Sequence, residues 1–442
     1  MYKTILSALL LVLLLSCSKE DKTVHLKGEL INFGQEVFMS KGTPEGKLLK
    51  EGVTIKLDEQ NRFDVTFKLT EPAYFRLGRN TLYLSPGDNL ELTCDLRDPM
   101  AGQFTGQAAN ACLYLRAKPF PKGGSFLQGG MMIKDNPSFD EVLSRLEQKV
   151  KERQKELNAV QNISERFKNL ENGRIMFGAA NTLMSYAGYA AWMKKLPEDE
   201  IKSFEQKASE YFKPSIKKYL EQGNNADFLN IDVYRDICYS CVEILGEDKM
   251  DQKVLDYIQT SNLLYYLSRQ GPVAKVYEQK KEIAKKIKDK TFIEVIEKSF
   301  EKYASLLPDQ PAPELTFTTQ EGTEVKLSDF KGKMVVMDVW ATWCGPCKNE
   351  SPHFEALAKK YQDKEIAFIA VSIDTNKKAW NNYITEHPKT SQQLITNRTV
   401  FADYQLEGVP RFMLIDKEGK FIECFAPAPS NPELEELIVK NL

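Results

Sequence analysis

Trp343-Cys344-Gly345-Pro346-Cys347 is the stretch of this 442-residue chain from which the organisation of its C-terminal part can be worked out. Residues 334–340, just before it, are almost all apolar, which predicts a buried strand. Residues 354–361, after it, carry apolar side chains at spacings of three and four, which predicts a helix. Two cysteines separated by two residues at such a strand-to-helix turn can form and break a small disulfide ring.

The expected start of the helix explains why these cysteines should be reactive. Cys344 should lie at the helix N-terminus, where unpaired N–H groups and the helix dipole favour negative charge. This position lowers the pKa of a thiol, and the thiolate is the nucleophile. Cys347, one turn further on, is expected to resolve the mixed disulfide that Cys344 forms with a substrate. Pro346 suits the first turn, where a backbone N–H is not required.

The stretch and its flanks resemble the TlpA/ResA-like branch of the thioredoxin-fold proteins. The resemblance runs roughly from residue 308 to residue 429. Its motifs, in chain order, are Pro-Ala-Pro at 311–313, Leu-Ser-Asp-Phe-Lys-Gly-Lys at 327–333, Trp-Ala-Thr-Trp at 340–343, Lys-Asn-Glu-Ser-Pro at 348–352 and Gly-Val-Pro at 408–410. It implies a C-terminal α/β thioredoxin fold and thiol-disulfide oxidoreductase activity that requires no cofactor and no metal.

The same resemblance implies roles for three further residues. Pro410 matches the cis-proline that faces the cysteines and lets backbone pair with an extended substrate segment. Asp338, six residues before Cys344, matches a buried acid that handles the proton of the second cysteine, and Glu350, six residues after it, matches an acid of the ResA-like branch. Either carboxylate can serve as the base if burial raises its pKa, and the sequence does not choose between them. The residues that flank the site are Trp343, Gly345, Pro346 and Val409.

The beginning of the chain predicts an exported lipoprotein. An apolar segment at 5–15 follows Lys3 and is too short to span a bilayer as a permanent helix. Leu-Leu-Ser-Cys at 14–17 resembles a bacterial lipobox, in which the signal peptide is cut before Cys17 and that cysteine is lipidated. An ordinary cleaved signal is the alternative. Lipid chains on Cys17 would attach the protein to a membrane of the cell envelope, and we expect it to face the periplasm, with the outer-membrane surface as the second option.

The patterning divides the chain into five segments. They are a signal peptide at 1–16, a lipidated tether at 17–23, a β domain of unknown function at 24–116, a helical domain at 117–304 and a thioredoxin-like domain at 305–442. Alternating apolar residues in the β domain predict an antiparallel sandwich or barrel. Apolar stripes among charged residues predict a helical bundle or stacked helix pairs in the next segment.

Four other cysteines need an interpretation. Cys238 and Cys241 should share one face of a helix, and we interpret them as core residues, with a structural or regulatory disulfide as the alternative. A zinc site needs four ligands, usually from pairs close in sequence, and this pair precedes the first one by about a hundred residues. Cys94 and Cys112 fit either a disulfide or two buried thiols equally well.

Together these features favour an extracytoplasmic, membrane-anchored thiol-disulfide oxidoreductase that reduces disulfides in client proteins and is recharged by a membrane electron-donor protein. The Gly-Pro spacer matches thioredoxin, a reductant, although oxidation and isomerisation remain open directions. With 62 acidic and 60 basic residues, the chain gives no reason to expect a nucleic-acid partner.

Two other functions are weighed against this one. Peroxiredoxins carry a proline and a threonine seven and three residues before their cysteine, and Met337 and Ala341 occupy those positions here. That difference argues against a thiol peroxidase. The remaining alternative is a binding or scaffold lipoprotein with an auxiliary redox domain, because the β and helical segments carry no visible catalytic residues.

Overall fold

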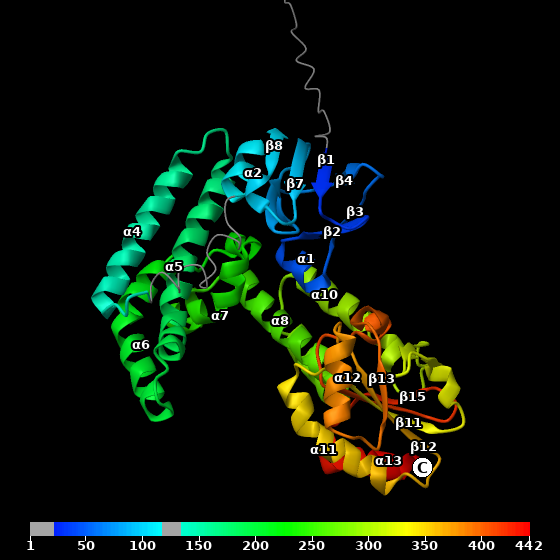
Figure 1. The fold of residues 1–442 in the computed structure, drawn as a ribbon. Coiled ribbons are helices and arrows are strands. Elements are labelled where there is room, and N and C mark those ends of the chain that lie inside the picture. The colour runs from blue at the N-terminus through cyan, green and yellow to red at the C-terminus, as the bar shows by residue number, and fades with distance from the viewer. Residues whose placement is uncertain (1–21, 117–133) are drawn as a thin grey trace, which may run out of the picture. The chain divides into compact units, whose positions relative to one another are not determined.

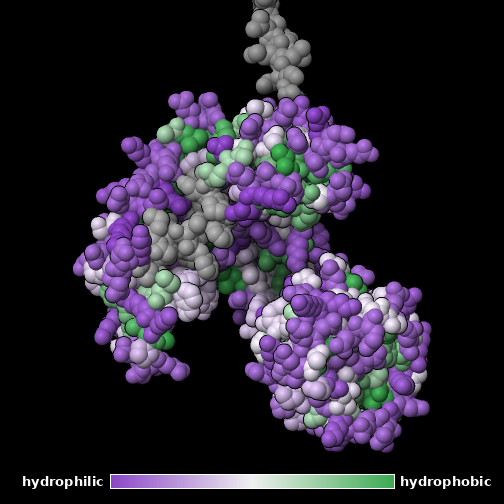
Figure 2. All heavy atoms as spheres, in the orientation of Figure 1, coloured by the Kyte–Doolittle hydropathy of each residue, from purple (hydrophilic) through white to green (hydrophobic). Residues whose placement is uncertain are grey.

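The computed structural model describes residues 22–116 and 134–442, which divide into two compact units that meet between Met250 and Asp251 (Figure 1). The predicted signal peptide, Cys17 and residues 117–133 of the predicted helical domain lie outside the described residues. As predicted, the chain has β sheets first, then helices, then an α/β thioredoxin-like domain. On the face drawn in Figure 2, the surface is mostly hydrophilic with small hydrophobic areas.

The first unit begins with two four-stranded sheets, in the orders β4-β1-β7-β8 and β3-β2-β5-β6. Their strands are β1 (Thr23–Ile31), β2 (Glu36–Lys41), β3 (Gly52–Lys56), β4 (Arg62–Lys68), β5 (Ala73–Leu77), β6 (Asn80–Leu84), β7 (Asn89–Asp95) and β8 (Gln103–Gly106). Neighbouring strands are antiparallel except for β1 and β7, which pair in parallel. Gly28 of β1, with φ +148°, allows this pairing, because a Cβ there would stand 1.8 Å from the Leu92 carbonyl oxygen.

The helices of the first unit follow the sheets. They are α1 (Pro44–Leu49), α2 (Ala109–Arg116), α4 (Phe139–Asn158), α5 (Glu165–Lys194), α6 (Glu198–Leu220) and α7 (Asp232–Leu245), with short 3-10 helices η1 (Pro99–Ala101), η2 (Ala226–Asn230) and η3 (Glu247–Lys249). Ser138 and Glu141 form a capping box at the start of α4. A buried network joins sheet to helix: the Tyr74 hydroxyl of β5 donates to Glu171 of α5 over 2.7 Å, and Arg174 Nε donates to the same oxygen over 3.0 Å.

The second unit contains six α-helices and a seven-stranded sheet in the order β10-β9-β13-β12-β11-β14-β15. Its helices are α8 (Gln252–Gln270), α9 (Ala274–Ala284), α10 (Lys290–Glu301), α11 (Gly345–Lys360), α12 (Lys377–Glu386) and α13 (Pro432–Asn441), with η4 (Ala304–Leu306), η5 (Leu327–Phe330) and η6 (Arg398–Tyr404). Its strands are β9 (Thr316–Thr318), β10 (Glu324–Lys326), β11 (Met334–Trp340), β12 (Ile366–Ser372), β13 (Gln392–Ile395), β14 (Arg411–Ile415) and β15 (Phe421–Ala426). The boundary expected at residue 305 stays a prediction, and α8–α10 fall in the same compact unit as the sheet.

Strand β11 is the centre of this sheet, because it pairs in parallel with β12 and antiparallel with β14. All seven of its residues are buried, as the apolar run predicted. Helices α11 and α13 lie side by side (Figure 1), where the Tyr361 hydroxyl donates to Glu435 over 2.6 Å. Among the described residues, no helix has both the length and the apolar character needed to cross a membrane.

Candidate active site

Strand β11 and helix α11 position the two cysteines of the central motif. Cys344 is the N-cap of α11, and its sulfur accepts a hydrogen bond from the backbone N–H of Cys347 over 3.2 Å. Cys344 and Cys347 form a disulfide, with Cα atoms 5.3 Å apart. The N–H groups of the first helical turn are therefore available to stabilise a thiolate on Cys344 once the disulfide is open.

The surroundings of the pair are open on one side. Trp343 is 67% exposed, and Gly345 and Pro346 are exposed as well. Both cysteines are themselves buried, Cys347 more deeply than Cys344. A substrate disulfide must therefore approach across the Trp343 side, where it meets Cys344 before Cys347.

Pro410 lies at the same edge of the sheet as the cysteines. The Val409–Pro410 peptide bond is cis, as the resemblance implied. Val339 of β11 is in register with Arg411 of β14, and these strands are antiparallel, so β14 begins where β11 ends. Pro410 and Val409 are half-buried at this edge, which leaves their backbone accessible to an extended chain.

Asp338 is buried at the centre of β11 with only 4% of its surface exposed. Its neighbours in the sheet are Ala370 and Phe412, and its Oδ1 atom has no hydrogen-bond partner among the described residues. Burial, reinforced by the negative charge of Glu355, raises the pKa of Asp338 to about 8. A carboxyl group with such a pKa exchanges protons close to neutral pH.

Glu350 is placed differently. Its carboxylate accepts hydrogen bonds from the backbone N–H and the hydroxyl of Ser430, each over 2.9 Å. It is only partly exposed on α11 and ties that helix to the segment before α13. Glu350 is therefore held by Ser430, whereas Asp338 is buried with an oxygen that has no hydrogen-bond partner among the described residues.

Several residues of the site were not predicted. The buried carboxylate of Asp374, which follows β12, accepts hydrogen bonds from the backbone N–H and the hydroxyl of Thr342, each over 2.8 Å. These bonds fix the turn between β11 and Cys344. The signal was available, because Asp374 directly follows a mostly apolar run at 366–373, and parallel neighbouring strands end at the same edge of a sheet.

Two charged groups that act on Asp338 were also not predicted from the sequence. Glu355 of α11 accepts hydrogen bonds from the backbone N–H groups of Thr390 and Ser391, at 2.6 and 3.0 Å. Lys389, from the same segment, donates to the Ser351 hydroxyl over 2.5 Å, and its positive charge opposes the rise in the Asp338 pKa. The segment between α12 and β13 therefore contributes to the electrostatics of the site, which no local motif indicated.

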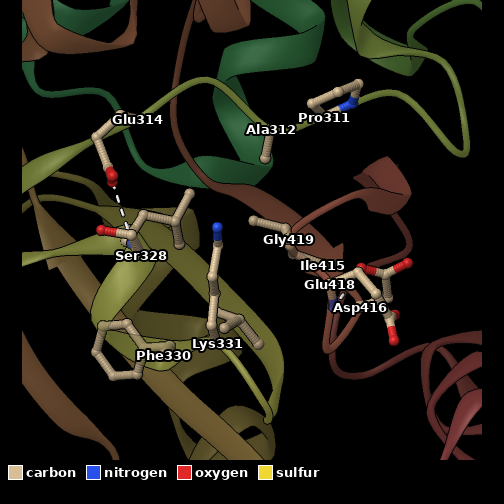
Figure 3. Close-up of a pocket in the computed structure, with 12 residues that line it drawn as sticks. Pro311, Ala312, Glu314, Ser328, Phe330, Lys331, Ile415, Asp416, Glu418 and Gly419 are labelled. Atoms are coloured by element: carbon tan, nitrogen blue, oxygen red, sulfur yellow. Dashed lines mark hydrogen bonds between the residues drawn. The ribbon is translucent and has the colours of Figure 1, made fainter.

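Figure 3 shows a hollow elsewhere in this unit, lined by residues of the segments around Glu314, Lys331 and Asp416. It lies where β11 begins and β14 ends, so it opens at the opposite end of the sheet from Cys344. Glu314 accepts a hydrogen bond there from the Ser328 backbone over 3.1 Å. This hollow contains no cysteine and is separate from the redox centre.

The remaining described cysteines are free and buried. They are Cys94, Cys112, Cys238, Cys241 and Cys424. Between the two options for Cys94 and Cys112, the structure has buried thiols, and Cys238 and Cys241 are core residues of α7. Within residues 22–116 and 134–442, no cluster of His, Cys, Asp and Glu side chains could hold a metal ion.

Comparisons with known proteins agree with this geometry. The Redoxin family matches residues 307–438. The thiol-disulfide oxidoreductase ResA of Bacillus cereus (strain ATCC 10987 / NRS 248) is 32% identical over 142 residues, which cover 32% of this chain and 82% of that protein. ResA of Bacillus subtilis (strain 168) is 30% identical over 120 residues, covering 27% of this chain and 67% of that protein.

A solved structure is also similar. The crystal structure of a candidate thiol-disulfide oxidoreductase from Bacteroides vulgatus is 44% identical, covers 31% of this chain and 99% of that chain, and has a TM-score of 0.31. The residues matched by the Redoxin family include the cysteine pair at the start of α11. Through its C-terminal Redoxin domain, the chain belongs to the family of thiol-disulfide oxidoreductases related to ResA and TlpA.

Proposed function

We propose that this protein reduces disulfides in client proteins outside the cytoplasm while a lipid on Cys17 attaches it to a membrane. One observation carries the catalytic part of the proposal: Cys344 caps α11 within a disulfide to Cys347, and Asp338, whose Oδ1 has no partner among the described residues, is buried in the preceding strand. This arrangement supplies a nucleophile, a resolving thiol and a proton-exchanging group.

The reaction balances as two thiol-disulfide exchanges. The Cys344 thiolate attacks one sulfur of a client disulfide, which forms a mixed disulfide and releases the first client thiolate. The Cys347 thiolate then attacks the Cys344 sulfur, which closes the Cys344–Cys347 disulfide and releases the second client thiolate. Two electrons pass to the client, and a dithiol donor must return two electrons to the pair.

Asp338 serves the second exchange. Cys347 is buried and must lose its proton before it can attack, and Asp338, buried in the strand that leads to the cysteine pair, is the acceptor that we propose. Because the pKa of Asp338 is raised to about 8, both of its protonation states are populated near neutral pH. Asp338 can therefore accept the proton of Cys347 when the disulfide closes and return it when the disulfide is reduced again.

The envelope location rests on the lipobox-like residues 14–17 and on the chemistry of the compartment. Client disulfides persist mainly outside the cytoplasm, so a reductant there needs an electron source in the membrane. In the native host, Cys17→Ala should move the protein from the membrane fraction to the soluble fraction. Retention of the variant in the membrane fraction would contradict lipid attachment at Cys17.

Insulin reduction by the full-length protein tests the catalytic proposal. Cys344→Ser should abolish turnover, and Cys238→Ser, which changes a cysteine at the same spacing in α7, should leave it unchanged. The reduction potential of the pair settles the direction. A value near roughly −270 mV supports a reductase, whereas a value near about −120 mV would make the same residues a disulfide donor.

A further inference from the structure

We propose that the C-terminal end of α8 extends the client-binding surface beyond the cis-proline edge, and that it holds an extended client segment with an acidic side chain near its cysteine. The residues concerned are Tyr265, Tyr266 and Arg269. This inference rests on the proposed function, because it assumes that clients are proteins. It assigns a part in client selection to a helix that lies outside the residues matched by the Redoxin family.

Close packing fixes the end of α8 against the sheet. Gly271, which ends the helix with φ +72°, lies so near β15 that a Cβ there would stand 2.2 Å from the ring of Phe425. Tyr303, after α10, packs on the same ring at a centroid distance of 5.9 Å. Only glycine permits this approach at 271, so the last turn of α8 has a defined position on the redox domain.

Arg411 connects that turn to the proline. It follows cis-Pro410 directly and is only 6% exposed. Its guanidinium lies 3.7 Å from the centroid of the Phe425 ring, and its Nη2 donates to the Ser268 carbonyl oxygen of α8 over 3.4 Å. Arg411, the first residue of β14, therefore links the end of the cis-proline loop to the last turn of α8.

Exposed side chains of α8 lie close to this contact between Arg411 and Ser268. Nη1 of Arg269 lies 3.2 Å from the point where a Cβ on Gly408 would stand, so it touches the loop that precedes the cis-proline. The Arg269 guanidinium lies 5.8 Å from the Tyr265 ring, and that ring lies 6.0 Å from the ring of Tyr266. Tyr265 is 58% exposed and Tyr266 42%.

Arg269 is a free cation on this surface. It is exposed, and it forms no salt bridge with any described residue. Arginine binds carboxylates with paired hydrogen bonds, and exposed tyrosines provide contact area at little conformational cost. The chemistry of the surface therefore matches an acidic polypeptide better than a neutral or basic one.

A client segment can reach both sites at once. An extended chain that pairs with the Val409–Pro410 backbone adds a strand at this edge and advances about 3.3 Å per residue. The loop at Gly408, one residue before that edge, is already in contact with Arg269. A client side chain a few residues from the reacting cysteine therefore falls within reach of Arg269 and of the two tyrosines beyond it.

Disulfide-linked peptides that differ only near the cysteine test this proposal. In three otherwise identical peptides, the residues two to four positions from the cysteine are all Glu, all Gln or all Lys, and the reduced full-length protein is the reductant. The second-order rate constant should be highest for Glu and lowest for Lys, with about a fivefold span, near the upper range for an exposed ion pair. Arg269→Glu should reverse the order, and Arg269→Gln should remove the preference.

Matched control variants test whether the effect belongs to the surface at the end of α8. Tyr265→Ala and Tyr266→Ala should slow all three peptides, whereas Tyr239→Ala, which removes a tyrosine of the same 58% exposure from α7, should slow none. Lys359→Glu reverses an exposed charge in the last turn of α11, about 20 Å along the helix from Cys344, and should keep the order of the parent.

A small aromatic disulfide separates this inference from the proposed function. It should react equally with the parent and the Arg269 variants, because it is too short to reach α8. A parent without a preference for the Glu peptide, or an Arg269→Glu variant that keeps that preference, overturns the inference while insulin reduction stands. Failure to reduce insulin would instead overturn the proposed function.

Discussion

Two pairs of cysteines in this molecule have the same spacing but different surroundings. Cys344 and Cys347 cap and begin α11 and form a disulfide, whereas Cys238 and Cys241 lie within α7 and remain free. Within α7 the backbone N–H groups are already used by the helix, and burial raises the pKa of each thiol to about 12. At the start of α11 the N–H groups are free to stabilise a thiolate.

The comparison teaches that spacing alone does not create a redox centre. The active pair combines a helix N-terminus, an exposed approach beside Trp343 and the buried acid Asp338. The pair in α7 is closed in by packing, where a Cβ on Gly223 would stand 2.9 Å from the Cys241 sulfur. The two pairs therefore provide an internal control for each other.

The largest expected effect is on thiol reactivity. In the reduced protein at pH 7, iodoacetamide should alkylate Cys344 at least about 1,000-fold faster than Cys238 or Cys241, because a thiol at a helix N-terminus is far more ionised than a buried one. Mass spectrometry of tryptic peptides measures the three rates. Comparable rates would mean that the helix end does not activate Cys344, and the comparison would fail.

The next largest effect concerns Asp338. Asp338→Asn should slow insulin reduction at pH 7 by about 100-fold, because an amide cannot exchange a proton with Cys347. The inflection of the rate near pH 8 should disappear with it. Asp363→Asn, on the exposed turn after α11, is the matched control and should change neither quantity.

The stability of the oxidised protein provides a second measure of Asp338. An unfolded aspartate titrates near about 3.9, and the folded pKa is about 8, so the folded state binds the extra proton between these values. The contribution of Asp338 to stability is thus complete below about pH 4 and is lost as the pH rises to about 8. Relative to the parent, Asp338→Asn should gain on the order of 5 kcal/mol in free energy of unfolding between these pH values, measured with urea, because the two pKa values differ by about four units.

The smallest effect is expected for Glu350. Glu350→Gln should change the rate of insulin reduction less than about twofold, because the carboxylate is occupied by Ser430. It should lower the free energy of unfolding by about 1 kcal/mol, the usual contribution of such hydrogen bonds. A tenfold loss of rate without loss of stability would transfer the role of the base from Asp338 to Glu350.

Much of the redox domain could be predicted because its signals are local. The apolar run at 334–340 became β11, and the apolar spacing at 354–361 belongs to α11, which ends at Lys360. The cis bond before Pro410 was also foreseen, through the resemblance. A buried strand, a turn and a helix start each depend on a few adjacent residues, so the sequence carries them directly.

What could not be predicted depends on contacts between distant residues. The parallel pairing of β1 with β7 joins segments more than fifty residues apart, and no alternation of apolar residues indicates its direction. The short helix α1, which Thr43 caps, is also not indicated by the alternating pattern of the β domain. The links of Asp374 to Thr342 and of Arg411 to Ser268 likewise become visible only when the chain is folded.

The network of Tyr74, Glu171 and Arg174 has a consequence for cooperativity. A hydrogen bond to a charged group contributes about 1.5 to 3 kcal/mol to stability. Separating β5 from α5 would break the buried bond between the Tyr74 hydroxyl and Glu171 and would expose the ring of Tyr74, which packs beneath Arg174. The sheets and helices of the first unit should therefore unfold in a single transition. A fragment of the β domain that ends before α4 would expose the surface of β5 that contacts α5 in the full chain.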